Sequence, residues 1–313
     1  MIYNIATRDG RCFLKTGACF FIIIYLITIF TPSENQQDET NGFIILFDRN
    51  ADASCGSSRE RQYKSGGLLQ KASALPGDSS RTMFFARQML GVPYVAGTLD
   101  EGKEENLVVH LDKVDCTTFV ETVLALALAD KDKERNFGSF KKALQHIRYR
   151  GGVLNGYPSR LHYFSEWIKD NERKGIVKER TDEFSTLQQE LHLNFMSTHP
   201  DSYRQLKDNP SLVAEIVRQE QALNGSVVTY FPKDQLSYPP YKLNIKDGDI
   251  LAITTNITGL DVVHVGLSVW VGDTLHLLHA SSVAKKVILD PQPMYDYSKN
   301  KRTHTGVRII SVL

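Results

Sequence analysis

Residues 116–127 most constrain the fold of this 313-residue chain, because they contain no proline or glycine and are mostly apolar. The apolar side chains recur at the spacing of a helix, at Phe119, Val120, Val123, Leu124 and Ala127. This pattern predicts a buried helix that begins at or just after Cys116. Asp115 directly precedes the helix, and we expect it to cap the first turn.

Cys116 would lie at the N-terminus of this helix. Unpaired backbone amides and the helix dipole favour negative charge there, so we expect the pKa of the thiol to be lowered. The same amides can bind an oxyanion that forms when the sulfur attacks a carbonyl group. Cys116 is therefore a candidate nucleophile. The alternative is an inert buried cysteine, which is the commoner role of a single cysteine before an apolar helix.

The composition limits the remaining possibilities. The net charge of +1 provides no basic surface for a nucleic-acid partner. Of the four cysteines, Cys12 and Cys19 lie near the N-terminus and Cys55 lies in a polar stretch. No disulfide framework is expected from this distribution, and a single thiol in the folded body favours a catalytic role.

The sequence divides into three parts. Residues 1–31 carry basic side chains followed by an apolar run, which is typical of a signal peptide or a signal-anchor. Residues 32–78 are polar and are expected to form a linker. Residues 79–313 are expected to form the folded domain. The protein is therefore expected to be exported, and to contact a membrane only through its N-terminal segment.

Within the domain, the sequence predicts an α+β fold in which the helix of Cys116 packs on an antiparallel sheet. Helical patterns occur at 79–90, 140–150, 160–174, 202–207 and 212–223, so residues from about 137 to 240 form an added helical segment. Strand patterns occur at 106–111, 250–253, 262–271, 274–280, 286–288 and 307–312.

Two histidines of the strand region can serve the thiol. His264 and His279 lie on consecutive predicted strands, and one face of the sheet can hold both rings. One imidazole would then be the general base and the other would orient it. The alternatives are ordinary packing histidines, or a zinc site made with Asp261 and His276. Neither a pair of histidines at helical spacing nor a pair of cysteines supports a metal.

Several motifs in this order resemble those of the NlpC superfamily, the papain-like cysteine amidases and endopeptidases of bacterial cell walls. They are Gly91–Gly97, Asp115–Cys116, Asp247–Ile250, His264–Gly266 and His279–Ser281. Further segments resemble the N-acetylmuramoyl-L-alanine amidase-like branch of that superfamily, known from Bacteroidetes. They are Val95–Asp100, Asp115–Glu121, Arg160–Phe164 and Gly259–Asp261. The resemblance covers roughly residues 79–313.

The resemblance implies a papain-like fold and a role for each matching residue. Cys116 would be the nucleophile, His264 the general base and His279 the residue that orients it. Tyr94 would lie beside the nucleophile and position it or assist the oxyanion. The candidate substrate contacts are Arg160, His162, Thr98 and Asp261. Arg160 and His162 are equally well explained as a solvated helix start and a packing residue. No metal or organic cofactor is implied.

The implied reaction is hydrolysis of the amide between N-acetylmuramic acid and L-alanine in peptidoglycan fragments, with a preference for anhydro-muropeptides. Such a protein would act in the periplasm. One alternative is an endopeptidase that cuts the stem peptide between γ-D-glutamate and the diamino acid. Another is a catalytically silent glycan-binding module.

Overall fold

The structure is a computed structural model that describes residues 53–313, except residues 101, 103 and 240–242. The predicted signal segment at 1–31 and the first part of the predicted linker lie outside the described residues. In the part that is described, no helix is both long enough and apolar enough to span a membrane.

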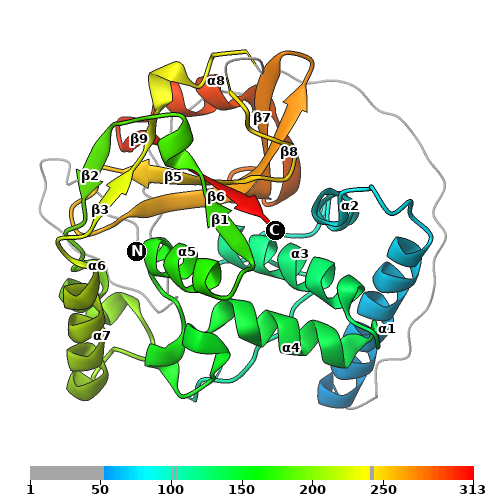
Figure 1. Cartoon of the computed structure of the whole chain (residues 1–313). Coiled ribbons are helices and arrows are strands. Elements are labelled where there is room, and N and C mark those ends of the chain that lie inside the picture. The colour runs from blue at the N-terminus through cyan, green and yellow to red at the C-terminus, as the bar shows by residue number, and fades with distance from the viewer. Residues whose placement is uncertain (1–52, 101, 103, 240–242) are drawn as a thin grey trace, which may run out of the picture.

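The domain has the predicted α+β architecture, built on a mainly antiparallel sheet (Figure 1). The strands of this sheet run in the order β1-β9-β5-β6-β7-β8, and β4 pairs with β9. Their bounds are β1 Val177–Glu179, β4 Phe231–Pro232, β5 Ile250–Thr255, β6 Val262–Val271, β7 Thr274–Ser281, β8 Lys286–Pro293 and β9 His304–Val312. Strands β2 (Gln188–Glu190) and β3 (Val227–Thr229) pair separately.

Helices cover both faces of the sheet. In Figure 1, α3, α4 and α5 lie below the sheet, α2 lies to its right and α8 lies above it. The helices are α1 Ala53–Ser73, α2 Arg81–Gln88, α3 Cys116–Lys131, α4 Phe137–Arg148, α5 Phe164–Arg173, α6 Phe195–Thr198, α7 Pro210–Leu223 and α8 Met294–Lys299. Short 3₁₀ turns occur at Arg150–Gly152, Tyr157–Ser159, Thr181–Glu183, Pro200–Ser202 and Lys233–Gln235.

Strand β5 shows why the sheet separates two cores. Successive side chains of a strand point to opposite faces. Ile250 and Ala252 pack with α3 in the larger core, whereas Leu251 and Ile253 pack in the core under α8. All of these side chains are buried, which explains why the sequence of this part of the strand is a continuous apolar run.

Helix α3 begins at Cys116, as predicted, because the side chains of two neighbouring residues close its first turn. The Asp115 carboxylate accepts a hydrogen bond from the Thr118 backbone amide at 2.8 Å, and the Thr118 hydroxyl accepts one from the Asp115 amide. This reciprocal pair satisfies two backbone donors that the helix geometry leaves free. The apolar residues that follow are fully buried, and the helix runs through the centre of the larger core.

Several local predictions were wrong. The predicted linker contains α1, and its residues Leu69 and Ala72 are buried in the larger core. Residues 106–111 are not a strand, and residues 203–208 form turns where a helix was expected. The segment from about 137 to 240 is mostly helical in its regular structure, as predicted, and it also contributes the short strands β1 to β4. Helix α5 starts at Phe164, so Arg160 and His162 lie before it.

Candidate active site

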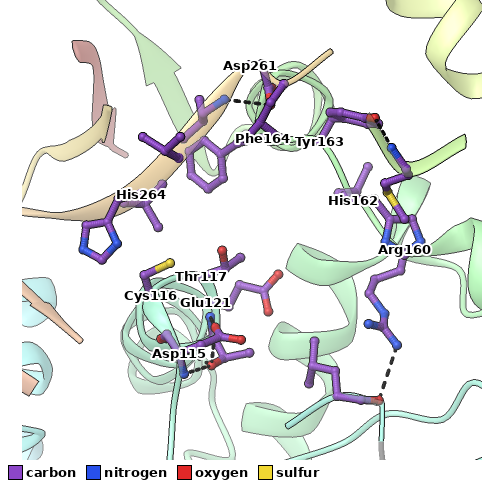
Figure 2. A pocket seen from close by; sticks show the side chains of 18 of the residues that line it. Asp115, Cys116, Thr117, Glu121, Arg160, His162, Tyr163, Phe164, Asp261 and His264 are labelled. Carbon is purple, nitrogen blue, oxygen red and sulfur yellow. Dashed lines mark hydrogen bonds between the residues drawn. The ribbon is translucent and has the colours of Figure 1, made fainter. Parts of the chain in front are cut away.

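A pocket opens where the N-terminus of α3, the segment before α5 and the start of β6 meet (Figure 2). Cys116 and His264 both line it, as do Tyr94 and the predicted substrate contacts Arg160, His162 and Asp261. Its apolar and aromatic lining is Leu99, Leu161, Tyr163, Phe164, Phe195, Met196, Tyr203, Leu260, Val262, Val263 and Val265. The remaining lining residues are Asp115, Thr117, Thr118 and Glu121. The predicted residues therefore converge on one pocket, except His279 and Thr98.

The Cys116 sulfur lies against strand β6. It receives a hydrogen bond from the backbone of Val265, the residue after His264, and further hydrogen bonds from Thr117. In Figure 2 the sulfur and the His264 ring occupy the same end of the pocket. The helix and the sheet thus bring together a thiol and an imidazole that are 148 residues apart in the numbering of the chain (264 − 116).

The pKa of the Cys116 thiol was predicted in the wrong direction. Burial raises this pKa to about 12, and the neighbouring Asp115 carboxylate acts in the same sense. The hydrogen bonds from Val265 and Thr117 favour the thiolate but do not outweigh desolvation. At neutral pH the resting group is therefore a thiol, and a base must remove its proton.

His264 is the base that the pocket offers. Its Nδ1 atom is buried and has no hydrogen-bond partner among the described residues. Burial lowers its pKa well below the usual histidine range, and the nearby His279, Lys301 and His304 act in the same sense. The ring is therefore neutral at neutral pH. Contacts between a nucleophile and its base are often long in unliganded enzymes and shorten when substrate binds.

His279 contacts His264 but does not line the pocket. The His264 Nε2 atom and the His279 Nδ1 atom are 2.6 Å apart, and the two rings are perpendicular. The other nitrogen of His279, Nε2, lies 3.2 Å from Oδ2 of Asp290 on β8. The sequence analysis anticipated the two histidines on one face of the sheet but missed Asp290. An acidic residue on the strand that follows His279 was the available signal.

Gly266 makes room for the pair of histidines. A Cβ atom added at Gly266 would lie 2.8 Å from the Cβ of His279 and 2.9 Å from the side chain of Leu277. Real Cβ atoms do not approach this closely. The glycine of the motif His264–Gly266 is therefore needed for the close approach of β7, which carries the second ring.

Tyr94 lies in the segment that pairs with the residues just before Cys116. It pairs in parallel with Val114, two residues before Cys116. The Val95 amide donates to the Val114 carbonyl at 2.9 Å, and the Val114 amide donates to the Pro93 carbonyl at 3.0 Å. These bonds fix the loop 91–97 against the start of α3, and the Tyr94 side chain lines the pocket.

The Arg160 guanidinium is held by two buried carboxylates. It donates to Asp100 at 2.9 Å, and to both oxygens of Glu105 at 2.9 and 2.5 Å. The side chain is 5% exposed. Arg160 borders the pocket, but its charge is already matched inside the protein. The geometry thus gives it a structural role at the base of the segment that carries His162.

His162 and Asp261 are oriented by backbone groups. The Nε2 atom of His162 donates to the Tyr157 carbonyl at 3.0 Å, which leaves Nδ1 as an acceptor. Burial lowers the pKa of His162 to about 3. Asp261 accepts from the Ser165 amide at 2.7 Å and from the Val262 amide at 2.8 Å, so it joins the start of α5 to the start of β6.

Thr98 is buried outside the pocket, and its hydroxyl oxygen has no hydrogen-bond partner among the described residues. The zinc alternative also finds no support in the geometry. His276 donates through Nδ1 to the Asp290 carbonyl at 2.9 Å, and Asp261 is held by amides as above. Within residues 53–313 as described, no cluster of three or more potential ligands could hold a metal ion.

Comparison with known proteins identifies the family. The model of the N-acetylmuramoyl-L-alanine amidase-like family matches residues 84–307, which is most of the described domain. This chain is a member of the N-acetylmuramoyl-L-alanine amidase-like family. Among curated proteins, none matches it significantly.

Solved structures agree with this membership. The amidase-like chain is 42% identical to an N-acetylmuramoyl-L-alanine amidase from Bacteroides uniformis, with a TM-score of 0.70 over 74% of this chain and 97% of that one. It is 43% identical to a Bacteroides fragilis protein named provisionally as a xylanase, with a TM-score of 0.69 over 72% and 99% of the two chains. A Legionella pneumophila protein shares the fold at 23% identity, with a TM-score of 0.66. The match covers 83% of this chain and 97% of the Legionella chain.

Proposed function

We propose that this protein hydrolyses the amide bond between N-acetylmuramic acid and L-alanine in peptidoglycan fragments, with Cys116 as the nucleophile. The family and the name of the Bacteroides uniformis relative support the choice of bond. The observation that carries the mechanism is the buried, unpartnered Nδ1 atom of His264 in the pocket that holds the sulfur. A buried nitrogen without a partner is costly, and a role as proton acceptor explains why it is kept.

In the first step the Cys116 sulfur attacks the lactyl carbonyl carbon and its proton passes to Nδ1 of His264. The thiol cannot ionise alone near neutral pH because its pKa is about 12, so attack and proton transfer occur together. The negative charge moves to the carbonyl oxygen. The Cys116 backbone amide at the start of α3 is one donor for this oxyanion, and Tyr94 is a candidate for a second.

In the second step the C–N bond breaks and His264 returns the proton to the nitrogen of L-alanine, which leaves as an amine. The lactyl group is then bound to Cys116 as a thioester. A water molecule gives a proton to His264 and its oxygen attacks the thioester carbon. The C–S bond then breaks and His264 returns the proton to the sulfur, which releases the lactyl acid and restores the thiol. Each proton taken up by His264 is given back, so the cycle needs no cofactor.

The pocket walls suit the groups around this bond. Leu161, Phe164 and Leu260 line the pocket and offer apolar surface. This surface fits the lactyl methyl group and the alanine side chain, which are small and uncharged. From the resemblance, we propose the anhydro form of the sugar as the preferred substrate and the periplasm as the site of action.

Mass spectrometry of a defined anhydro-muropeptide tests the proposal. Incubation with the wild type should release the free anhydro-disaccharide and the intact stem peptide, and Cys116→Ala should release neither. Release of a sugar that still carries a dipeptide would identify the γ-D-glutamyl endopeptidase instead. Binding of the muropeptide without any cleavage by the wild type would identify a glycan-binding module.

A glycosidase, which the name of the Bacteroides fragilis protein suggests, is disfavoured by the carboxylates of this pocket. Glycoside hydrolysis uses two free carboxyl groups on either side of the bond. Asp115 caps α3, Glu121 binds Arg148 at 2.7 Å, and Asp261 is held by two backbone amides. Xylan incubated with the protein should therefore yield no reducing sugar.

A further inference from the structure

Asp290, His279 and His264 form a line of three side chains in contact. The His279 Nε2 atom is 3.2 Å from Asp290 Oδ2, and the His264 Nε2 atom is 2.6 Å from His279 Nδ1. All three residues are buried, with 1% to 8% of their surface exposed. At the other end of the line, His264 Nδ1 has no hydrogen-bond partner among the described residues, and His264 lines the pocket together with Cys116.

The chemistry of these groups allows one arrangement of protons along the line. Burial opposes ionisation of Asp290, but the hydrogen bonds from His279 and the Gln292 amide, together with the nearby His279 and Lys301, outweigh it and hold the carboxyl pKa below its usual range. An ionised carboxylate can only accept, so His279 Nε2 carries the proton and donates it. In neutral His279 the Nδ1 atom is then bare and accepts from His264 Nε2. The His264 Nδ1 atom is left bare, as a base that faces the thiol requires.

We propose that Asp290 is a positioning residue that fixes the tautomer of the catalytic base through His279. It also stabilises the positive charge that the two rings share after His264 takes the proton of Cys116. This inference deepens the proposed function and rests on it for its kinetic consequences. Its structural content, the position of one proton on His264, is independent of the substrate.

The second oxygen of Asp290 makes a sharp test possible. Oδ1 accepts from the Gln292 backbone amide at 2.9 Å, while Oδ2 faces His279. In Asp290→Asn the side-chain oxygen must stay with the Gln292 amide, because the new NH₂ group and the Gln292 N–H are both donors and cannot bond to each other. The new NH₂ group then faces His279 Nε2 and donates to it. Each proton in the line shifts by one position, and His264 Nδ1 becomes protonated.

The inference therefore predicts an unusual order of activities. Asp290→Asn should lower kcat by ~10²–10⁴-fold, the usual contribution of a general base, because it imposes the wrong tautomer. Asp290→Ala removes the constraint without imposing the wrong tautomer, so its loss of kcat should be smaller, with KM little changed in both. A merely structural carboxylate would give the reverse order, since asparagine preserves shape and the Gln292 bond. Activity of Asp290→Asn equal to or above that of Asp290→Ala would overturn the inference.

Two further measurements make the outcome independent of folding and of the substrate. Asp273→Asn, in the exposed turn between β6 and β7, is the matched control and should retain wild-type kcat. Nitrogen NMR of wild-type protein labelled with ¹⁵N-histidine reports the protonated nitrogen of His264, assigned by loss of the signal in His264→Gln. A proton on Nε2 supports the inference even if no muropeptide is cleaved, and a proton on Nδ1 overturns it.

Discussion

The His264 Nε2 atom lies 2.6 Å from His279 Nδ1, and the two ring planes meet at 90°. The Tyr297 ring of α8 packs against both, with centroids 6.4 Å from His264 and 5.6 Å from His279. Of the two histidines, only His264 lines the pocket. The pair therefore consists of one ring that lines the pocket and one ring that contacts it from outside the pocket lining.

The different positions of the two rings predict a graded loss of activity. Cys116→Ala and His264→Ala should each abolish turnover, because one removes the nucleophile and the other its base. His279→Ala should lower kcat by less, since His264 can still accept a proton in a fraction of its orientations. Steady-state kinetics on an anhydro-muropeptide would measure this, with melting temperatures to confirm folding. Equal losses in all three variants would contradict the orienting role of His279.

Gly266→Ala should disturb the contact between His264 and His279 without changing either imidazole ring. The added methyl group would lie 2.8 Å from the His279 Cβ, so β7 and its ring must move away from His264. Overpacking of this kind costs ~1–3 kcal/mol of stability. We expect a lower urea midpoint and a lower kcat. Gly67→Ala in α1 is the control, because none of the described residues has an atom within 4 Å of the added Cβ. Full activity in Gly266→Ala would show that the spacing of the rings is not critical.

Asp115→Asn should make the nucleophile more reactive while leaving the helix start intact. Asparagine can still accept the hydrogen bond of the Thr118 amide, but the negative charge that raises the pKa of Cys116 is removed. Alkylation by iodoacetamide near neutral pH should therefore be faster than in the wild type. Asp115→Ala also loses the cap, at a cost of ~1 kcal/mol in stability. An unchanged alkylation rate in Asp115→Asn would mean that the carboxylate does not influence the thiol.

The start of α3 and the strands around His264 could be predicted because their signals are local. A capping residue before an apolar run at helical spacing fixes one helix, and apolar runs bounded by turns mark β5 to β7. The pairing of His264 with His279 followed from two consecutive strands. Residues 53–73 were misread as a linker because their composition is polar, although tertiary contacts of Leu69 and Ala72 hold α1 on the domain.

The electrostatics of the site could not be predicted from local pattern. The start of a helix favours a thiolate, but the depth of burial that raises the pKa of Cys116 depends on the whole fold. The partner carboxylates of Arg160 lie 55 and 60 residues away in the sequence, so its buried ion pairs could not be inferred from its position near a helix. Asp290 was missed because its role appears only when β8 pairs with β7.

Arg160→Ala should act mainly on stability. It would leave Asp100 and Glu105 buried without a cation, and breaking a buried pair in this way costs ~3–5 kcal/mol. Arg173→Ala is the control, because its side chain is 63% exposed and surface pairs contribute ~1 kcal/mol or less. Chemical denaturation would measure both. A normal unfolding midpoint for Arg160→Ala together with a raised KM would instead support the prediction that Arg160 contacts the substrate.

The buried histidines should make the protein sensitive to acid. Burial lowers the pKa of His162 to about 3, and the positive charge of Arg160 contributes to this shift. Burial also lowers the pKa of His304 to about 3. In the unfolded chain both take up a proton near pH 6.5, so the unfolded state binds more protons below that pH. Their contribution to stability is complete above about pH 6.5 and is lost as the pH falls toward 3, with a slope of ~1.4 kcal/mol per pH unit for each.

His162→Gln isolates one of these two contributions. Glutamine can keep the N–H group that donates to the Tyr157 carbonyl but has no group that titrates in this range. The urea midpoint of the variant should therefore fall less steeply between pH 6.5 and 4 than that of the wild type. His192→Gln, whose histidine side chain is 76% exposed, should follow the wild-type curve. If His162→Gln is as acid-sensitive as the wild type, His162 is protonated in the folded protein, and its bare Nδ1 atom is not available to accept a hydrogen bond from a substrate.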